Sequence, residues 1–377
     1  MRVAHLTLLT LVLPCLACES EEDEPKGFSI VTYNAGLADG FVPYARERAP
    51  LIEDALADLR TDVMCVQEVW TQADWDGLAM AAAGSFPHTY RRDPEPSANS
   101  TCEEGELDDI EACINDLCGD EPVDKLATCA LDNCKDEVGN LGATCLNCLI
   151  SQLGNTIEDV KATCESGGEG SSYAYEGSFG TGILSNLPLD DTDSLLLPST
   201  ANRRAVLYAS FEEPTLGKVH FFCTHLTANL SAVPYTGSFG SWELEQKKQV
   251  QIMLDFIEQK AGETGTVILA GDLNSGPAAE GFLAELPENY ALYAEAGLRD
   301  PYADEGKPLC TYCDENLLNS DLAAGEGGLI DHVMLPETLE GTAERLLTGT
   351  VDITFEGEPL TTSYSDHYGI RMVVTRR

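Results

Sequence analysis

Basic residues are scarce in this sequence, which has 22 Lys and Arg against 64 Asp and Glu and a formal net charge of −42. A surface this acidic repels nucleic-acid phosphates and anionic lipids, and it attracts cations. The pairs Arg91-Arg92, Arg203-Arg204 and Lys247-Lys248 are not joined by a basic stripe, whereas DNA binding relies on Lys and Arg contacts to phosphate. The composition therefore disfavours a nucleic-acid partner, although such acidity also serves solubility or adaptation to salty surroundings.

Long hydrophobic runs are also scarce, and the one at residues 6–17 is too short to span a membrane. An acidic stretch follows it, so we predict a signal peptide at 1–17 and an acidic tether at 18–27. Leu16-Ala17-Cys18 resembles a bacterial lipoprotein cleavage site, although Cys15 stands where an aliphatic residue is usual. We therefore expect an exported protein, either secreted or held by a lipid anchor on Cys18.

Histidine is absent from a cysteine-rich, acidic segment, residues 94–177, that interrupts the chain. Its eight cysteines are Cys102, Cys113, Cys118, Cys129, Cys134, Cys145, Cys148 and Cys164. Zinc remains an alternative, but the missing histidine and the expected export favour disulfides. Cys-x4-Cys spacing places two sulfurs on one helix face, so we predict short helical hairpins joined by disulfides. Such an insert would stabilise the protein or bind a partner of unknown identity.

The remaining cysteines receive different predictions. Cys65 and Cys223 lie within predicted core strands and are expected to be buried thiols. Cys310 and Cys313 are close in sequence without a surrounding βαβ pattern, which favours a local loop disulfide over a redox motif.

The rest of the chain is β-rich with interleaved helices. Apolar runs predict strands at 28–33, 62–66, 182–185, 205–211, 219–224, 266–270, 330–335 and 369–375. Helical spacing of apolar residues predicts helices over 45–59 and 242–259. Short strands with intervening helices indicate layered sheets covered by helices.

Polar side chains recur where these strands begin or end. They are Asn34, Glu68, His225, Asp272 with Asn274, Asp331 with His332, and Asp366 with His367. Asp272 and Asn274 leave one buried strand on the same side, because strand side chains alternate. Singly, Asn34 could be a turn residue, Glu68 a solvated strand end and His225 a core imidazole. Six such placements in one chain are hard to explain by turns, so they predict a binding or catalytic site.

In these motifs the chain resembles the endonuclease/exonuclease/phosphatase superfamily, which includes DNase I-like nucleases, neutral sphingomyelinases and inositol-polyphosphate phosphatases. The matching residues are Thr32-Tyr33-Asn34, Gln67-Glu68, Thr224-His225-Leu226, Gly271-Asp272-Leu273-Asn274, Ile330-Asp331-His332 and Ser365-Asp366-His367, in the family's order. The resemblance covers residues 28–375 apart from the insert and gives a catalytic domain at 28–377. It implies an α/β fold, a four-layer sandwich of two packed, mostly antiparallel sheets flanked by helices.

The resemblance also implies a hydrolase that cleaves a phosphodiester with water and a divalent metal. Glu68, with Asn34 and Asp366, would hold Mg²⁺ through oxygen ligands, and Mn²⁺ or Ca²⁺ would suit the same set. The metal would offset the charge that develops on the phosphoryl group.

Five further residues receive catalytic roles from the resemblance. Asp272 would orient or deprotonate the attacking water, and Asn274 would donate hydrogen bonds to the transition state. His367 would be a general acid/base or phosphate ligand, with Asp331 fixing its tautomer. His225 would contact the phosphate from the opposite side. Apurinic-site endonucleases carry Tyr at this last position, so the chain stands nearer the DNase I, sphingomyelinase and phosphatase branches. His332 should point to the other side of its strand and serve packing.

Substrate choice depends on weaker signals. Tyr235, Phe239 and Trp242 follow His225 amid Gly, Ser and Pro, and they could rest on a lipid interface or pack as a local cap. With the acidity, they favour a sphingomyelin-type or small phosphodiester over a polynucleotide. A secreted DNase I-like nuclease and a non-catalytic surface binding protein are the alternatives, and the second is disfavoured because every catalytic position holds a competent residue.

Overall fold

The computed structural model describes residues 27–95, 99–165, 170–262, 265–304, 306–320 and 322–377 of the 377-residue chain. The predicted signal peptide, the predicted acylation site Cys18 and almost all of the predicted acidic tether lie outside the described residues. Among the helices in these ranges, none has both the length and the hydrophobicity that crossing a membrane requires.

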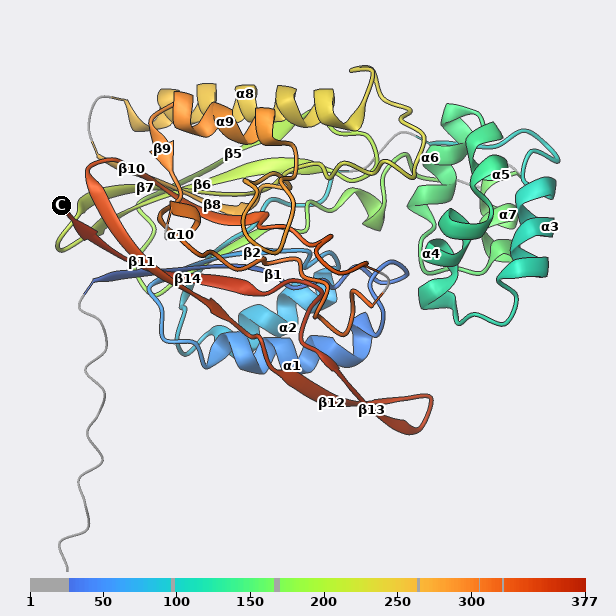
Figure 1. The fold of residues 1–377 in the computed structure, drawn as a ribbon, viewed down its shortest axis with the longest axis horizontal. Helices are drawn as coiled ribbons and strands as arrows, with labels where there is room; N and C mark the ends of the chain where they lie inside the picture. The colour runs from blue at the N-terminus through green and yellow to red at the C-terminus, as the bar shows by residue number, and fades with distance from the viewer. Residues whose placement is uncertain (1–26, 96–98, 166–169, 263–264, 305, 321) are drawn as a thin grey trace, which may run out of the picture.

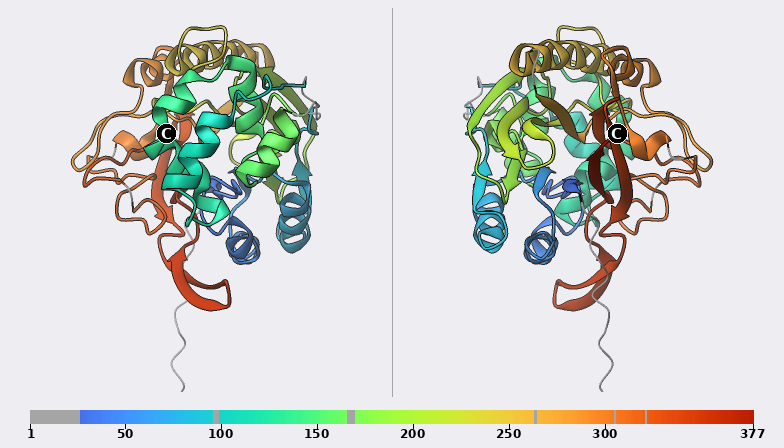
Figure 2. Two further views of the ribbon diagram at one scale, coloured as in Figure 1. Left: turned by 90° about the vertical axis from the view of Figure 1, so that its right-hand side faces the viewer. Right: turned by 90° about the vertical axis from the view of Figure 1, so that its left-hand side faces the viewer.

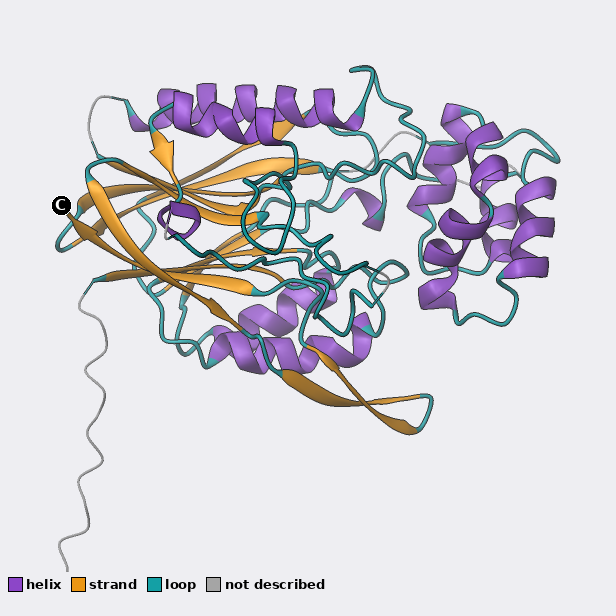
Figure 3. Ribbon diagram, viewed as in Figure 1, coloured by secondary structure: helices purple, strands orange, loops and turns teal. Residues whose placement is uncertain are grey.

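Two six-stranded sheets face each other at the centre of the fold, with helices on their outer faces (Figures 1 and 3). The first sheet runs in the order β11 (Leu339–Leu346), β14 (Gly369–Arg376), β1 (Phe28–Asn34), β2 (Val63–Gln67), β4 (Gly182–Ser185) and β3 (His88–Tyr90). The second runs β5 (Asp191–Leu197), β6 (Arg204–Glu213), β7 (Gly217–His225), β8 (Thr266–Asp272), β10 (Asp331–Pro336) and β9 (Leu298–Arg299). Neighbouring strands pair antiparallel except β1 with β2 and β7 with β8. The predicted four-layer α/β sandwich is confirmed.

Alternation along the strands assigns each apolar side chain to a layer. Ile30 of β1 and Phe221 of β7 belong to the core between the sheets. Val31, the next residue of β1, packs instead in the cluster that contains helices α1 (Ala45–Ala57) and α2 (Gln72–Ala82). The outer face of the second sheet is covered in the same way by α8 (Trp242–Ala261) and α9 (Pro287–Glu295).

A disulfide between Cys65 and Cys223 crosses this central core. Both residues are buried as predicted, but the expectation of free thiols is wrong. They lie on strands β2 and β7 of opposite sheets, so their side chains meet across the interface. The two residues are 158 positions apart in the sequence, and only the sheet-on-sheet arrangement brings them together.

The cysteine-rich segment folds into a cluster of short helices at one end of the sandwich (Figures 1 and 2). They are α3 (Asp108–Leu117), α4 (Val123–Asn133), α5 (Lys135–Asn140), α6 (Ala143–Ser151) and α7 (Ile157–Cys164). The cysteines pair as Cys102–Cys145, Cys113–Cys134, Cys118–Cys129 and Cys148–Cys164. Two of these bonds join α3 to the α4 region, as the spacing predicted for a disulfide-linked helical hairpin. The segment has its own apolar core.

Candidate active site

The two parallel strand pairs bring the predicted residues to one end of the sandwich. Asn34 lies opposite Gln67 at the end of β1 and β2, and His225 lies opposite Asp272 at the end of β7 and β8. Asp331 begins β10 directly opposite Asp272. The two sheet edges meet where Asn34 Nδ2 donates a hydrogen bond of 2.9 Å to Asp272 Oδ2.

Asp272 stands at the centre of this cluster. Its Oδ1 accepts a 2.9 Å hydrogen bond from the backbone N–H of Asn274, while its Oδ2 is bound by Asn34. Asp272 Oδ2 also lies 3.4 Å from His225 Nε2 and 3.9 Å from His367 Nε2. Burial raises the pKa of Asp272 to about 7. This carboxylate therefore has the proton affinity of a general base near neutral pH.

The close approach of β8 to β7 requires a glycine at position 271, directly before Asp272. The φ of Gly271 is +156°, and a Cβ there would clash with the carbonyl oxygen of Thr224 on β7. A glycine at the end of this buried strand therefore lets β8 lie against β7 and sets the position of Asp272.

His367 is held by a buried ion pair with Asp331, whose Oδ2 lies 2.8 Å from His367 Nδ1. Burial disfavours the charged ring, but the carboxylates of Asp331 and Asp366 outweigh it and raise the pKa of His367 well above its ordinary value. Asp272, Asp331 and His367 present ligand atoms within 4.8 Å of one another. The Asp331–His367 hydrogen bond suits this trio to proton transfer, while Asp331 Oδ1 is buried without a partner among the described residues and leaves an oxygen for a cation.

The best-placed metal ligands are Glu68 and Asp366. Glu68 Oε2 is buried with no hydrogen-bond partner within the described residues, which is costly for a carboxylate. Burial, and then the charge of Asp366, raise the pKa of Glu68. Two carboxylates that repel each other, one of them with an unpaired oxygen, fit a hard divalent cation. Asn34, predicted with them, accepts from the Gly36 N–H at 3.0 Å and donates to Asp272, so the structure also gives it an orienting role.

Glu68 and Asn274 both adopt left-handed backbone conformations, with φ of 56° and 46°. Glutamate rarely occupies this region, and such strain persists only where the surroundings impose it. Here the Leu37 N–H donates to the Glu68 carbonyl at 3.2 Å, and the Val69 N–H donates to Gly180 at 3.0 Å. Asparagine adopts this region readily, so only the backbone of Glu68 is strained, and the strain supports a functional role for Glu68.

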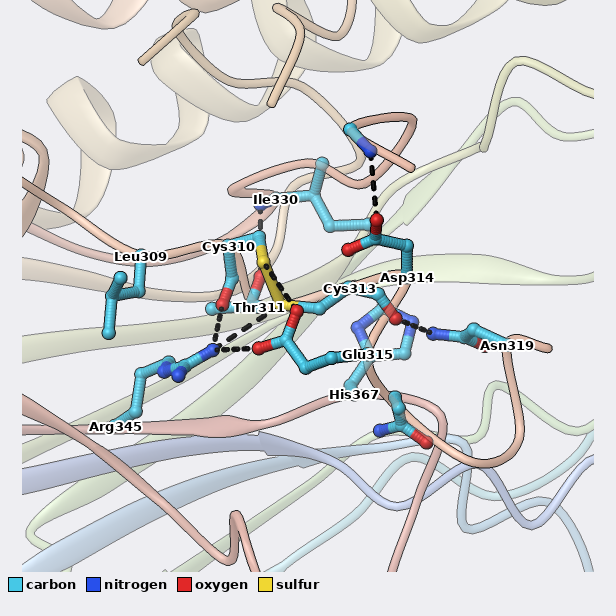
Figure 4. Close-up of a disulfide and its surroundings, with 12 residues drawn as sticks. Leu309, Cys310, Thr311, Cys313, Asp314, Glu315, Asn319, Ile330, Arg345 and His367 are labelled. Atoms are coloured by element: carbon cyan, nitrogen blue, oxygen red, sulfur yellow. Dashed lines mark hydrogen bonds and ion pairs between the residues drawn. A yellow bond between two sulfur atoms is a disulfide. The ribbon is translucent and has the colours of Figure 1, made fainter. Parts of the chain in front are cut away.

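A loop closed by the Cys310–Cys313 disulfide supports the predicted site residues Asp331 and His367 (Figure 4). Thr311 Oγ1 accepts a hydrogen bond of 3.2 Å from the Asp331 N–H, and the Thr311 carbonyl accepts one of 2.8 Å from the Tyr368 N–H. The loop therefore fixes the backbone beside His367 and at the start of β10. The prediction of a local disulfide at this position is confirmed.

Three aromatic and basic residues near the site were not predicted. The Arg204 guanidinium lies 5.6 Å from the ring of Trp70, which stacks on Tyr175 with ring centres 4.9 Å apart. Arg204 Nη1 is buried with no partner among the described residues. Burial lowers the pKa of Arg204 to about 10, although the nearby carboxylates of Glu68 and Asp272 act to raise it. A buried guanidinium with an unpaired N–H is suited to a phosphate oxygen.

His332 and the loop aromatics lie outside this cluster. His332 Nδ1 lies 2.6 Å from Asp300 Oδ2, and His332 is fully buried, as its predicted packing role requires. Trp242 donates to the Val233 carbonyl at 2.9 Å and packs edge-on against Tyr235 at 5.0 Å. Tyr235 and Trp242 therefore pack together as a local cap, and Trp242 also lines the cavity described next.

Six of the predicted site residues line a cavity of about 550 Å³. They are Glu68, His225, Asp272, Asn274, Asp366 and His367. Arg204, Trp70 and Tyr175 line the same cavity. Its volume is that of a ligand pocket for a small organic molecule.

Comparison with known proteins identifies the fold. A sequence profile described as the endonuclease/exonuclease/phosphatase family matches residues 31–367. Sphingomyelinase C from Streptomyces griseocarneus superposes with a TM-score of 0.55 at 16% identity, covering 93% of this chain and 99% of its own. Magnesium-bound beta toxin from Staphylococcus aureus superposes with a TM-score of 0.56 at 14% identity. The match covers 92% of this chain and 99% of the toxin chain. Truncated TDP2 from Caenorhabditis elegans superposes with a TM-score of 0.51 at 13% identity. The match covers 93% of this chain and 98% of the TDP2 chain. Among curated proteins, no sequence matches significantly.

Proposed function

Because the chain belongs to the endonuclease/exonuclease/phosphatase family, we propose that it is an exported, divalent-metal-dependent phosphodiesterase acting on a lipid or small phosphodiester. The observation that carries the proposal is the buried Asp272 carboxylate, held by Asn34 and lying within 3.9 Å of both His225 and His367. A base, two imidazoles and the unpaired Glu68 oxygen face one cavity, and this set is suited to hydrolysis of a phosphodiester.

Glu68 and Asp366 would hold the cation, with Asn34 beside them. Mg²⁺ suits these oxygen donors, as do Mn²⁺ and Ca²⁺. When bound, the ion supplies positive charge that stabilises the phosphoryl oxygens as negative charge develops on them. It would also relieve the repulsion between the two carboxylates.

Asp272 would take a proton from the attacking water through Oδ2, while Asn34 and the Asn274 N–H keep its two oxygens in place. The Asn274 side-chain amide donates one N–H to the Leu226 carbonyl at 3.0 Å, which leaves the other N–H for a phosphoryl oxygen. These contacts orient the base before substrate arrives, and that preorganisation lowers the barrier.

His367 would carry the proton to the leaving oxygen from Nε2, since Asp331 engages Nδ1. His225 presents Nε2 toward Asp272 and Glu68, at 3.4 and 4.0 Å, and would contact the phosphate from the side opposite His367. Arg204 would add a charge-assisted hydrogen bond to the same phosphate.

A zwitterionic or neutral phosphodiester suits this molecule better than a polynucleotide. The net charge of −42 opposes the approach of a polyanion. The structural relatives include a protein named sphingomyelinase C. Six disulfides among the described residues favour an oxidising compartment, and so export. The lipid anchor on Cys18 and the boundaries of the insert at 94–177 remain part of the proposal.

A substrate panel tests the proposal. The purified mature protein is assayed with Mg²⁺ or EDTA on sphingomyelin, phosphatidylcholine, plasmid DNA and bis-p-nitrophenyl phosphate. We expect Mg²⁺-dependent hydrolysis of the small diester and of a choline phospholipid. Undiminished activity in EDTA would refute the metal, and preferential cleavage of plasmid DNA would favour a nuclease instead.

A further inference from the structure

The cysteine-rich helices form the far wall of the catalytic cavity. From the side, they lie across one end of the sandwich (Figure 2, left). The cavity that Asp272 and His367 line is continuous with a space lined by Leu126 of α4 and Leu149 of α6. Contacts to the catalytic domain hold this wall, including a 2.7 Å hydrogen bond from Thr236 to Asn147 of α6.

The side chains that the insert contributes to this space are largely apolar, although the insert as a whole is strongly acidic. Residues 94–177 contain nineteen acidic residues and three basic ones. None of their charged side chains within the described residues lines the cavity, whereas Ile110, Ile114, Leu131, Ile150 and Val160 do. We call this apolar part of the cavity the chamber. A surface that binds phosphates or sugars would instead be lined by charged or polar side chains.

Disulfides link the helices that line the chamber. Cys113–Cys134 and Cys118–Cys129 tie α3 to the α4 region, and Cys148–Cys164 ties α6 to α7. A small helical cluster without such links would close onto an internal apolar space to regain contacts. A persistent apolar cavity excludes water and takes apolar ligands instead.

The mouth of the cavity also exposes apolar side chains. Phe41, Val123 and Leu283 line it and are 42%, 40% and 65% exposed. Phe41 and Leu283 belong to the catalytic domain, and Val123 begins α4 of the insert. Apolar residues from both parts therefore converge where a ligand would enter, which is typical of a binding site for an apolar group.

We propose that the chamber binds the alkyl or acyl chain of a lipid phosphodiester whose phosphate lies against Asp272 and His367. The inference rests on the proposed function for the position of the phosphate. An alkyl or acyl chain is the occupant that the structure favours, because the chamber is uncharged, lined by the helices and continuous with the predicted catalytic residues. Each methylene buried there would raise affinity about fourfold, the equivalent of ~0.8 kcal/mol.

The test compares p-nitrophenyl phosphodiesters of methanol, octanol and dodecanol below their micelle concentrations. In the wild type, kcat/KM should rise more than tenfold from the methyl to the octyl ester. Ala127→Trp, at a half-buried chamber position in α4, should flatten this rise and leave the methyl ester unchanged. Ala112→Trp, on the exposed side of α3 and outside the chamber, is the matched control and should keep the rise.

Calorimetric titration with dodecylphosphocholine in EDTA separates the chamber from catalysis. Binding by the wild type and the control, but not by Ala127→Trp, would support the chamber even if no ester were hydrolysed and the proposed function failed. Hydrolysis of the methyl ester with no gain from a longer chain and no binding would overturn the chamber while retaining the enzyme. Equal loss of binding in both tryptophan variants would overturn it as well.

Discussion

Unpaired buried atoms characterise this site at the scale of single residues. Glu68 Oε2, His225 Nδ1 and Arg204 Nη1 all lack a hydrogen-bond partner within the described residues. Buried polar groups in folded proteins are normally paired. Carboxylate, imidazole and guanidinium groups facing one cavity therefore fit the proposed cation and anionic substrate.

Sequence patterns could locate most of these residues but not Arg204. Asn34, Glu68, His225 and Asp272 stand at the ends of apolar runs, which marks them. Arg204 instead begins β6 within a basic pair, where Arg203 and Arg204 look equivalent. The structure separates them, because Arg204 is buried, whereas Arg203 is half-buried and its guanidinium lies 4.1 Å from the ring of Tyr173.

Asp331→Asn tests the ion pair that orients His367. The amide keeps the shape of the side chain but no longer stabilises a protonated imidazole, so kcat should fall about 10²-fold or more, as expected when a general acid is impaired. Steady-state kinetics on bis-p-nitrophenyl phosphate measure this, with circular dichroism to confirm the fold. Retained kcat would show that His367 acts without Asp331.

Arg204→Ala tests the phosphate contact. Loss of a charge-assisted hydrogen bond of about 1.5–3 kcal/mol should lower kcat/KM roughly tenfold to a hundredfold and weaken inhibition by inorganic phosphate. Arg203→Ala is the matched control and should leave both values unchanged. The contact would be contradicted if the two variants behaved alike.

At the scale of elements, the sequence predicts the buried strands well and the exposed ones poorly. The strand 182–185 has the predicted bounds, and β8 continues beyond its predicted end at residue 270 to Asp272. The hairpin of β12 (Thr350–Phe355) and β13 (Glu358–Ser363) and the polar edge strand β5 were missed. Exposed strands carry few apolar residues, so the hydrophobic pattern that marks a strand is weak there.

The Cys65–Cys223 bond shows why the element arrangement matters for stability. It links β2 to β7 across the core and closes the longest loop of the disulfides described. Joint replacement by Ala should lower the free energy of unfolding of the catalytic domain by about 2–5 kcal/mol, as measured by denaturant melts. Replacing Cys113 and Cys134 together should leave that transition in place, since they lie in the insert. An unchanged midpoint for the first pair would contradict the role of this bond.

At the scale of the whole molecule, a strongly acidic surface surrounds a cavity with an apolar wall. The sequence indicates the acidity and the insert, but not that the insert lies over the candidate active site. Strand patterns describe neighbours within a sheet, whereas the position of a separate helical cluster depends on a few contacts such as Thr236 to Asn147.

The net charge predicts how salt affects substrate preference. At fixed Mg²⁺, the ratio of kcat/KM for a zwitterionic diester to that for an anionic one should be largest at low salt. It should fall as the screening length shrinks from roughly 30 Å at 0.01 M to about 8 Å at 0.15 M. Assays across this range measure the ratio, and a ratio that rises with salt would contradict a long-range effect of the charge of −42.

The most direct test of the central claim is hydrolysis of bis-p-nitrophenyl phosphate by Asp272→Asn and the wild type, each with Mg²⁺ and with EDTA. Asp255→Asn, an exposed change on α8, serves as the control. We predict that the wild type and the control hydrolyse the diester only with Mg²⁺, and that Asp272→Asn is slower by about 10²-fold or more while remaining folded. Wild-type rates in Asp272→Asn would contradict the assignment of Asp272 as the catalytic base.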